Sequence, residues 1–353
     1  MPYCRNCGAK LDADARFCRV CGAPVSLVAS RELQRPRSVR RAGFPVAAIA
    51  AIIIVLLVVA ALVVLFFPFQ PVRFSQSNEA SAVNVGRLNL LFNSDIANVN
   101  IVLRDLPGNQ LAASNVTATG FRGIFGDDKP LALSFDENTN SSALTWLVTV
   151  ARAGGWSAVS PLSVVCDLYI DPSVNLSVSL TTGTGSIILN ADREATFERL
   201  ALQTTTGGVE ASVTQAVTIS GPLSLQTTTG SVQLSWDDVA VSADIPVSVK
   251  TTTGSANVNI TQTRQLGGNV TLNAQVVTGG VNFAMKIQNS VGAAISASTT
   301  LGGIDVQEDG FSGNQAPLQS SNYPAASNFY VTLQGTTGGI NIDAIYELGG
   351  VRS

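Results

Sequence analysis

A short cassette recurs seven times in the second half of this 353-residue chain and constrains its fold more than any other feature. Each copy has a Thr-rich stretch, a Gly-Gly or Gly-Ser pair and then alternating apolar residues, at intervals of 22, 23, 24, 25, 23 and 36 residues. A period of this size is typical of stacked repeats, in which one unit cannot bury its apolar face alone. The first glycines of the pairs are Gly185, Gly207, Gly230, Gly254, Gly279, Gly302 and Gly338.

The third copy shows what the alternation implies. Its apolar side chains sit at Leu223 and Leu225 before the glycine, and at Val232 and Leu234 after it. Strict alternation predicts strands, and the change of parity at Gly230 predicts a bend that keeps the apolar side inward. We therefore predict a mainly β fold, with an extracytoplasmic β-solenoid of about seven coils over residues 166–353. The long last interval predicts that Gln307–Asn328 loops out of one coil as an insertion.

The same register predicts two rows of threonines. One row, next to the corner, should point inward as a ladder: Thr184, Thr206, Thr229, Thr253, Thr278 and Thr337, with Leu301 as the exception. The middle threonines should point outward: Thr205, Thr228, Thr252, Thr300 and Thr336. The simplest explanation is that β-branched threonine suits a pleated sheet, and the alternative is an outward recognition surface for ordered water or glycan. An ice-binding face would need two outward threonines per coil, but the second outward position is usually glutamine: Gln203, Gln226, Gln275 and Gln334.

Four cysteines at the start of the chain predict a metal site. Cys4, Cys7, Cys18 and Cys21 give the spacing C-x2-C-x10-C-x2-C, and four thiolates satisfy a tetrahedral, structural Zn²⁺. The chain has no histidine, which excludes a mixed Cys/His site. A segment of about 24 residues cannot fold on an apolar core, so the metal would supply the folding energy. Two disulfides or a redox Cys-x-x-Cys motif are the alternatives.

Residues 3–24 also resemble a known family. Both Cys-x-x-Cys-Gly turns and Phe17 before the second pair are similar to the small prokaryotic zinc ribbon found at the start of membrane proteins. This resemblance implies a structural zinc ribbon over residues 1–24, without implying a particular partner.

An apolar run follows a basic segment. Residues 46–67 consist of Ala, Ile, Val, Leu and Phe, and no charge occurs between Arg41 and Arg73. A run of this length predicts a transmembrane helix over residues 45–68, with a basic linker over 25–44 before it and a short linker over 69–76 after it. A cleaved signal peptide is the alternative, which the length of the run and its late start disfavour.

The charge distribution predicts the orientation in the membrane. Residues 1–45 hold nine Lys/Arg and three Asp/Glu, whereas residues 46–353 hold 12 and 21. The positive-inside rule then predicts a single-pass protein of the cell membrane, with a cytoplasmic N-terminus and an extracytoplasmic C-terminal domain. Reduced thiols agree with a cytoplasmic ribbon. The basic linker should contact anionic lipid, and nucleic acid is the less favoured partner.

Residues 77–165 lack the cassette but show strand alternation, which predicts an N-terminal cap with irregular first coils. Cys166 lies in an apolar run and should be a buried core residue rather than a reactive thiol. Five Asn-x-Ser/Thr sequons are acceptors for glycosylation if the organism modifies its surface proteins: Asn115, Asn140, Asn175, Asn259 and Asn269.

The cassette itself, as in residues 226–234 and 334–342, resembles the putative-adhesin domains of prokaryotic membrane and cell-wall proteins. This resemblance covers about residues 160–349 and implies a β-solenoid on an anchored stalk. The high threonine content and the zinc-ribbon front depart from that family, so its role carries over only loosely.

The sequence favours a binding protein over an enzyme. Without histidine, Ser-His-Asp, Cys-His and His-metal sites are excluded, and no phosphate-binding loop occurs. The adjacent carboxylates Asp127-Asp128 and Asp237-Asp238 lie in turn-like sequence, where loop acids are the usual explanation. We expect a non-enzymatic surface or envelope protein whose solenoid binds an envelope protein or glycan. The alternative is a transmembrane sensor whose zinc ribbon docks a cytosolic protein.

Overall fold

The computed structural model describes residues 3–13, 15–24, 46–66, 70–122, 129–140, 142–153, 162–288, 290–313 and 317–348. The chain divides into two compact units, Met1–Phe66 and Phe67–Ser353. The predicted basic linker and the Asp127-Asp128 pair lie outside the described residues.

The first unit contains the cysteine-rich segment and one helix, α1 (Val46–Phe66). The helix consists only of Ala, Ile, Val, Leu and Phe, and the side chains described in it, those of residues 49–60, are all exposed. Counting the described residues alone, no helix is both long enough and apolar enough to cross a membrane.

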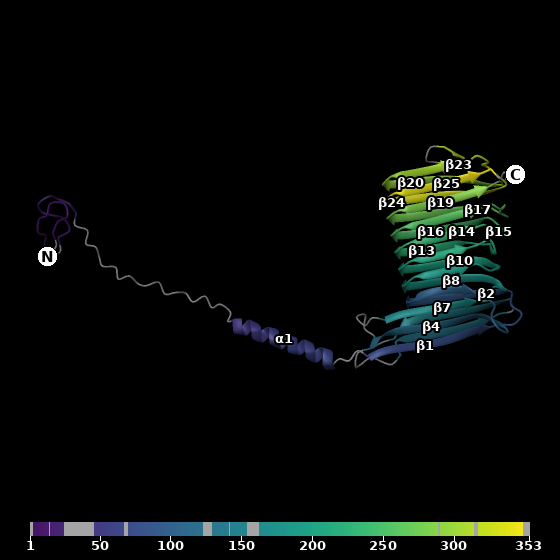
Figure 1. Cartoon of the computed structure of the whole chain (residues 1–353), viewed down its shortest axis with the longest axis horizontal. Helices are drawn as coiled ribbons and strands as arrows, with labels where there is room; N and C mark the ends of the chain where they lie inside the picture. The colour runs from purple at the N-terminus through teal and green to yellow at the C-terminus, as the bar shows by residue number, and fades with distance from the viewer. Residues whose placement is uncertain are drawn as a thin grey trace, which may run out of the picture. The chain divides into compact units, whose positions relative to one another are not determined.

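The second unit is built almost entirely of strands in two sheets (Figure 1). The first sheet has 11 strands. Their order is β1 (Gln70–Ser81), β4 (Gln110–Arg122), β7 (Leu162–Ile170), β3 (Asn98–Leu103), β9 (Ile187–Ala191), β11 (Val209–Val213), β14 (Val232–Asp237), β17 (Ala256–Gln262), β19 (Val281–Gln288), β25 (Ile340–Glu347) and β21 (Ile304–Asp309).

The second sheet has 14 strands, of which the short β12 (Val217–Ile219) and β15 (Ala240–Val241) lie off the main path. The order along that path is β22 (Phe311–Ser312), β23 (Leu318–Ser320), β20 (Val291–Leu301), β24 (Ser327–Thr337), β18 (Val270–Thr278), β16 (Ile245–Thr253), β13 (Leu223–Thr229), β10 (Ala195–Thr206), β8 (Asn175–Thr184), β2 (Arg87–Ile96), β6 (Ala143–Arg152) and β5 (Leu131–Thr139).

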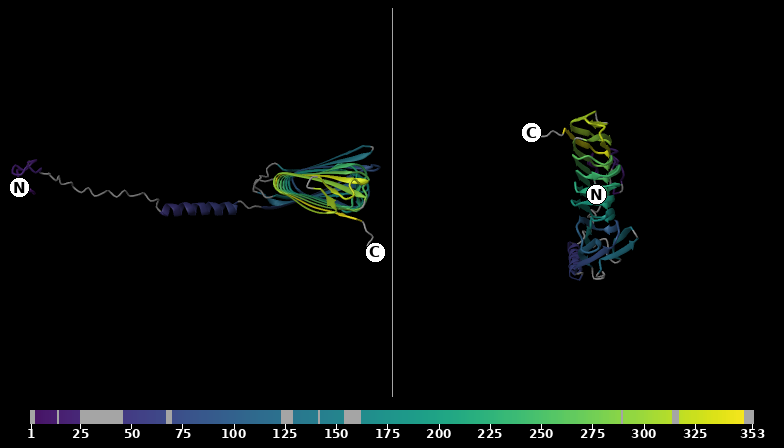
Figure 2. Two further views of the ribbon diagram at one scale, coloured as in Figure 1. Left: turned by 90° about the horizontal axis from the view of Figure 1, so that it is seen from above. Right: turned by 90° about the vertical axis from the view of Figure 1, so that its right-hand side faces the viewer.

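The mainly β fold is therefore confirmed, but the sheets are mixed and open. The cassette strands pair in parallel, whereas β1, β4 and β7 at one end and β22 and β23 at the other pair antiparallel. In the view from above in Figure 2, the strands of successive cassettes lie over one another. The more specific prediction of a solenoid of about seven regular coils is not confirmed, because antiparallel strands extend both sheets beyond the repeats.

Each cassette contributes one strand to each sheet, and equivalent residues of neighbouring cassettes are paired. Thr206 pairs with Thr229, and Thr229 pairs with Thr253, all directly before a corner glycine. At the corner itself, the N–H of Gly207 donates to the carbonyl of Thr229 at 2.9 Å, and that of Gly230 donates to Thr253 at 2.9 Å. Strands β2 and β3 form the same kind of corner, but here Ala97 takes the place of the glycine.

Only glycine fits the corners that follow. Gly230 has a φ of 140°, and a Cβ placed on it would lie 2.0 Å from the carbonyl oxygen of Gly207. The backbones of neighbouring corners are thus in direct contact, and the conformation is one that other residues rarely adopt. The predicted role of these glycines in bends is confirmed.

The predicted register of the threonines at the corner is wrong. The residues expected to point inward next to each glycine are exposed: Thr184, Thr206, Thr229, Thr253, Thr278, Thr337 and Leu301. The buried threonines are those two positions earlier, Thr182, Thr204, Thr227 and Thr251. The physical reason is that the bend takes four residues, such as 228–231, rather than a single glycine, so both threonines before the glycine leave the core. The middle threonines, which were predicted to point outward, are all exposed: Thr205, Thr228, Thr252, Thr300 and Thr336.

The buried threonines also have a polar role. The Oγ1 of Thr227 donates to the carbonyl of Gly207 at 2.9 Å, and that of Thr251 donates to Gly230 at 3.0 Å. Thr204 makes the equivalent bond to Gly185 at 2.9 Å. Each hydroxyl therefore satisfies a corner carbonyl of the neighbouring cassette, which a buried polar group requires.

The order of the last cassettes differs from the order in the sequence. The seventh cassette, β24 and β25, lies between the fifth, β18 and β19, and the sixth, β20 and β21 (Figure 1). Of the predicted insertion, residues 307–309 belong to β21, residues 311–312 and 318–320 form β22 and β23, and Asn328 lies in β24. The long interval therefore does not loop out of a coil; it carries the chain past the sixth cassette and back into the stack.

Residues 70–165 cover the other end of the stack. Strand β1 begins at Gln70, and β2, β6 and β7 bury Phe92, Trp146 and Leu168 in the same core as the cassettes. Cys166 is fully buried in this core, as predicted, and burial followed by the charge of Asp167 raises the pKa of its thiol to about 12.

Candidate functional site

The four cysteines lie together at the ends of two similar turns. Their sulfur atoms all lie within 4.8 Å of one another, with 3.7 Å between Cys4 and Cys21 and 3.5 Å between Cys7 and Cys18. A disulfide needs about 2.05 Å, whereas four sulfurs around one Zn²⁺ at about 2.3 Å would be separated by about 3.8 Å. The thiols are free, and their arrangement fits a single tetrahedral metal ion.

The backbone explains why the thiols converge. In the first turn the N–H of Gly8 donates to the carbonyl of Cys4 at 2.9 Å, and in the second Gly22 donates to Cys18 at 2.8 Å. Both glycines have positive φ, 72° and 71°, which the tight turn requires. The cysteine spacing thus predicted one site, to which two equivalent backbone turns each contribute two thiols.

The thiols have unequal proton affinities in this arrangement. Backbone hydrogen bonds from Cys21 and Val20 lower the pKa of Cys18 to about 6. The backbone of Ala9 lowers the pKa of Cys7, but the side chains of Cys21 and Cys18 outweigh it, and the pKa of Cys7 rises to about 12. Four thiolates this close together repel one another, so a bound cation would favour their ionisation.

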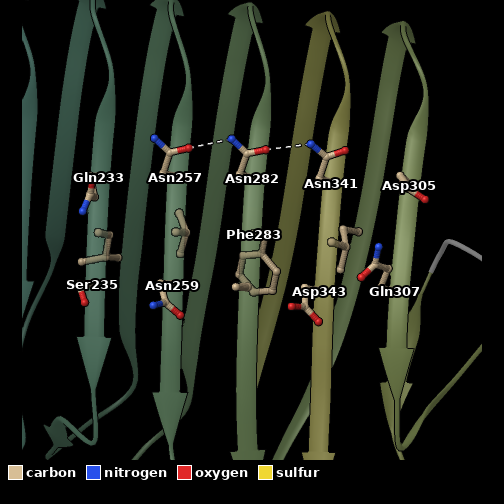
Figure 3. Close-up of a pocket in the computed structure, with 14 residues that line it drawn as sticks. Gln233, Ser235, Asn257, Asn259, Asn282, Phe283, Asp305, Gln307, Asn341 and Asp343 are labelled. Atoms are coloured by element: carbon tan, nitrogen blue, oxygen red, sulfur yellow. Dashed lines mark hydrogen bonds between the residues drawn. The ribbon is translucent and has the colours of Figure 1, made fainter.

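A second candidate site lies on the outer side of the first sheet. Its five strands β14, β17, β19, β25 and β21 line a shallow groove of about 670 Å³. We call this surface the amide face; Figure 3 shows its side chains. The outward residues form two rows across the strands, which are Gln233, Asn257, Asn282, Asn341 and Asp305, and Ser235, Asn259, Ala284, Asp343 and Gln307.

The first row is a hydrogen-bonded ladder. The Nδ2 of Asn282 donates to Oδ1 of Asn257 at 2.8 Å, and that of Asn341 donates to Oδ1 of Asn282 at 2.9 Å (Figure 3). The lining residues include the carboxylates of Asp305 and Asp343 but no lysine or arginine. The face can therefore donate and accept hydrogen bonds at intervals of about 4.8 Å, the strand spacing.

Sequence reasoning missed the amide face, although the signal is in the sequence. The ladder residues occupy the third position after a corner glycine: Gln233, Asn257, Asn282, Asp305 and Asn341. The outward glutamines that were singled out instead lie on the other sheet, where Nε2 of Gln275 donates to Oε1 of Gln334 at 2.6 Å.

The remaining predicted residues have structural surroundings. Asp238 accepts hydrogen bonds from the N–H and Oγ1 of Thr263 and from the N–H of Arg264, and so links two cassettes. Asp237 is exposed, and the two carboxylates do not form a paired site. Among the sequons, Asn259 lies in the groove, whereas the side-chain Oδ1 of Asn269 accepts from the N–H of Asn328 at 3.0 Å.

Comparisons with known proteins identify the N-terminal segment. Residues 3–25 match the zinc-ribbon domain family, so the N-terminus is a zinc-ribbon domain. No curated protein matches the chain.

Several solved structures resemble the chain. One is a putative cell adhesion protein from Clostridium sporogenes, at 13% identity and a TM-score of 0.36, covering 77% of this chain and 99% of that one. A putative adhesin from Bacteroides fragilis has 7% identity, a TM-score of 0.27 and coverage of 76% and 97%. A third, from Parabacteroides merdae, has 10% identity, a TM-score of 0.25 and coverage of 76% and 95%. These likenesses are too distant to carry an argument about function.

Proposed function

We propose that this chain is a membrane-anchored, non-enzymatic surface or envelope protein that binds its partner through the amide face. The observation that carries the proposal is the groove across five strands, with its ladder from Asn257 to Asn341. Amide side chains pair equally well with sugar hydroxyls and with backbone groups of proteins. An envelope glycan or protein is therefore the expected partner.

The test compares the two outer faces of the β unit. Asn282→Arg places a long cation in the middle of the groove, whereas Ser224→Arg places the same group on the outer side of the other sheet. Both full-length variants would be assayed against a glycan array and against isolated cell-envelope fractions. We expect Asn282→Arg to weaken binding at least about tenfold and Ser224→Arg to leave it unchanged. Equal binding by both variants would refute the role of the amide face.

The anchoring part of the proposal rests on the apolar run at residues 46–67 and on the excess of basic residues before it. We propose a single span with the zinc ribbon in the cytoplasm and the β unit outside. Alkaline carbonate extraction should leave the chain in the membrane pellet, and protease added to intact cells should digest only the β unit. Release into the soluble fraction would contradict the anchor.

For the ribbon, we propose that Cys4, Cys7, Cys18 and Cys21 hold a structural Zn²⁺. The support is the close sulfur cluster, which leaves no ligand position for substrate. Metal analysis of the purified chain should give one zinc per chain, and a chain without Cys18 should retain none.

A second function, transmembrane sensing, is favoured by one observation on the ribbon. Tyr3, Phe17 and Val20 are exposed by 64%, 63% and 76%, which is a large apolar surface for so small a domain. On this proposal the ribbon docks a cytosolic protein. Phe17→Ser should abolish that capture without affecting binding at the amide face, and unchanged capture would remove the support for sensing.

A further inference from the structure

The position of the seventh cassette has a consequence for how copies of this chain interact. This cassette is the last pair of strands among the described residues, yet it is paired on both sides. The N–H of Gly279 donates to the carbonyl of Thr337 at 2.9 Å, and the N–H of Gly338 donates to the carbonyl of Leu301 at 2.8 Å. Both of its strands are therefore interior strands of their sheets, with the fifth cassette on one side and the sixth on the other.

The slot that receives the seventh cassette has two matching walls. Thr337 pairs with Thr278 on one side and with Leu301 on the other, at the same position before the corner glycine. The corners repeat this match, because a Cβ on Gly338 would touch the Gly279 carbonyl and a Cβ on Gly302 would touch the Gly338 carbonyl. The fifth and sixth cassettes thus present complementary edges in one register, and any chain segment with the seventh cassette's sequence fits between them.

The order of synthesis makes this slot the last one to be filled. Residues 291–320, which form the far wall and its covering strands, precede residues 327–347 in the chain. The seventh cassette must therefore enter after the sixth has been made. An element that inserts late between two preformed edges can be exchanged between identical chains with all of its contacts preserved.

We propose that the slot between the fifth and sixth cassettes is an acceptor for residues 327–347 of a second copy of this chain. Exchange keeps the buried side chains of Phe329, Val331 and Ile340 in the same surroundings, so the two arrangements differ mainly in the entropy of association. The partner is thus another copy, and neighbouring anchored copies become linked through their C-terminal cassettes. This linkage does not depend on which partner the amide face binds, although the exchanged segment carries Asn341 and Asp343 of that face.

The experiment uses two full-length copies produced together, one with Thr278→Cys and the other with Thr337→Cys. Both positions are exposed and directly paired in the stack, so they lie within disulfide distance only where a cassette of one copy occupies the slot of the other. We expect an inter-chain product on a non-reducing gel, several-fold above the matched mixture of Thr253→Cys and Thr278→Cys copies. That control pair is also adjacent in the stack, but it stays within one chain when residues 327–347 are exchanged.

Two outcomes would overturn the proposal. A mixture that gives no more inter-chain product than the control, while a single chain with both Thr278→Cys and Thr337→Cys closes its internal disulfide, excludes exchange. If that internal disulfide does not form, Thr278 and Thr337 are not neighbours, and the fifth and sixth cassettes do not form the proposed slot. In addition, adding Gly338→Val to the Thr337→Cys copy should abolish the inter-chain product, because the side chain would clash with Gly279.

Discussion

Neither the zinc ribbon nor a single cassette buries enough apolar surface to fold alone, and the two parts are stabilised in different ways. Among its described residues, the ribbon buries Cys4, Leu11 and Cys18, with Ala9 and Ala23 packed against them, and closes around four thiols. The stack buries one row of apolar side chains from each cassette against the next, in one continuous core. The first structure depends on a ligand and the second on its neighbours, and this difference determines which changes each part tolerates.

The largest expected effect is the unfolding of one part of the chain without the other. Removing the metal with a chelator, or replacing Cys18 with serine, should unfold the ribbon, since structural zinc contributes about 10–16 kcal/mol in comparable small domains. The β unit should keep its denaturant midpoint, measured by the fluorescence of its buried tryptophans Trp146 and Trp236. A shifted midpoint would show that the two parts are not independent.

The next effect concerns the backbone contact at the corners. Gly254→Val should destabilise the β unit by more than about 4 kcal/mol, because a Cβ there lies 1.9 Å from the Gly230 carbonyl and φ is 140°. Gly303→Val is the matched control, since a Cβ on Gly303 meets nothing within 4 Å. Denaturant unfolding should therefore distinguish the variants clearly, and similar losses in both would contradict the corner contact.

A smaller effect concerns the buried hydroxyls. Thr251→Val keeps the shape but removes the bond to the Gly230 carbonyl, and should cost about 1 kcal/mol. The neighbouring exposed Thr252→Val should change stability by less than about 0.5 kcal/mol. If the exposed position proved the more costly one, the corrected register of the threonines would be wrong.

The smallest effect is pH-dependent. Burial raises the pKa of Asp238, but hydrogen bonds from Thr263 and Arg264 outweigh it and hold that pKa below its ordinary value. A lowered carboxyl pKa stabilises the fold above the unfolded pKa, and this stability is lost as the pH falls through the folded pKa. Asp238→Asn should therefore weaken the β unit at pH 7, and this difference should shrink progressively as the pH falls below about 4. A difference that persists at pH 2 would indicate another cause.

The sequence predicted more of the architecture than of the sites. Alternation and glycine spacing located both strands of every cassette, because burial on one side of a strand has a period of two. They did not show how far the corner extends around the glycine, because Thr228 and Thr229 can each continue the alternation and only backbone geometry shows that both leave the core. They also did not predict the place of the seventh cassette, since every cassette edge offers the same pairing.

Of the two candidate sites, the metal site could be predicted from the sequence and the amide face could not. The cysteine spacing identified the ribbon, because the ligands of a small metal site lie close together in the sequence. The amide face combines residues from Gln233 to Asp343, and only the stacking order brings Asn282 beside Asn341 rather than beside Asp305. A surface built from separate cassettes becomes visible only when their order is known.

The order of the cassettes is the central claim, and one measurement tests it directly. In a single full-length chain, Thr278→Cys with Thr337→Cys should form an internal disulfide, because these residues are paired neighbours. Thr278→Cys with Leu301→Cys should not, because the seventh cassette separates them by two strand spacings, about 9.6 Å. The reverse result, a disulfide in the second chain only, would show that the cassettes stack in the order of the sequence and would contradict the account.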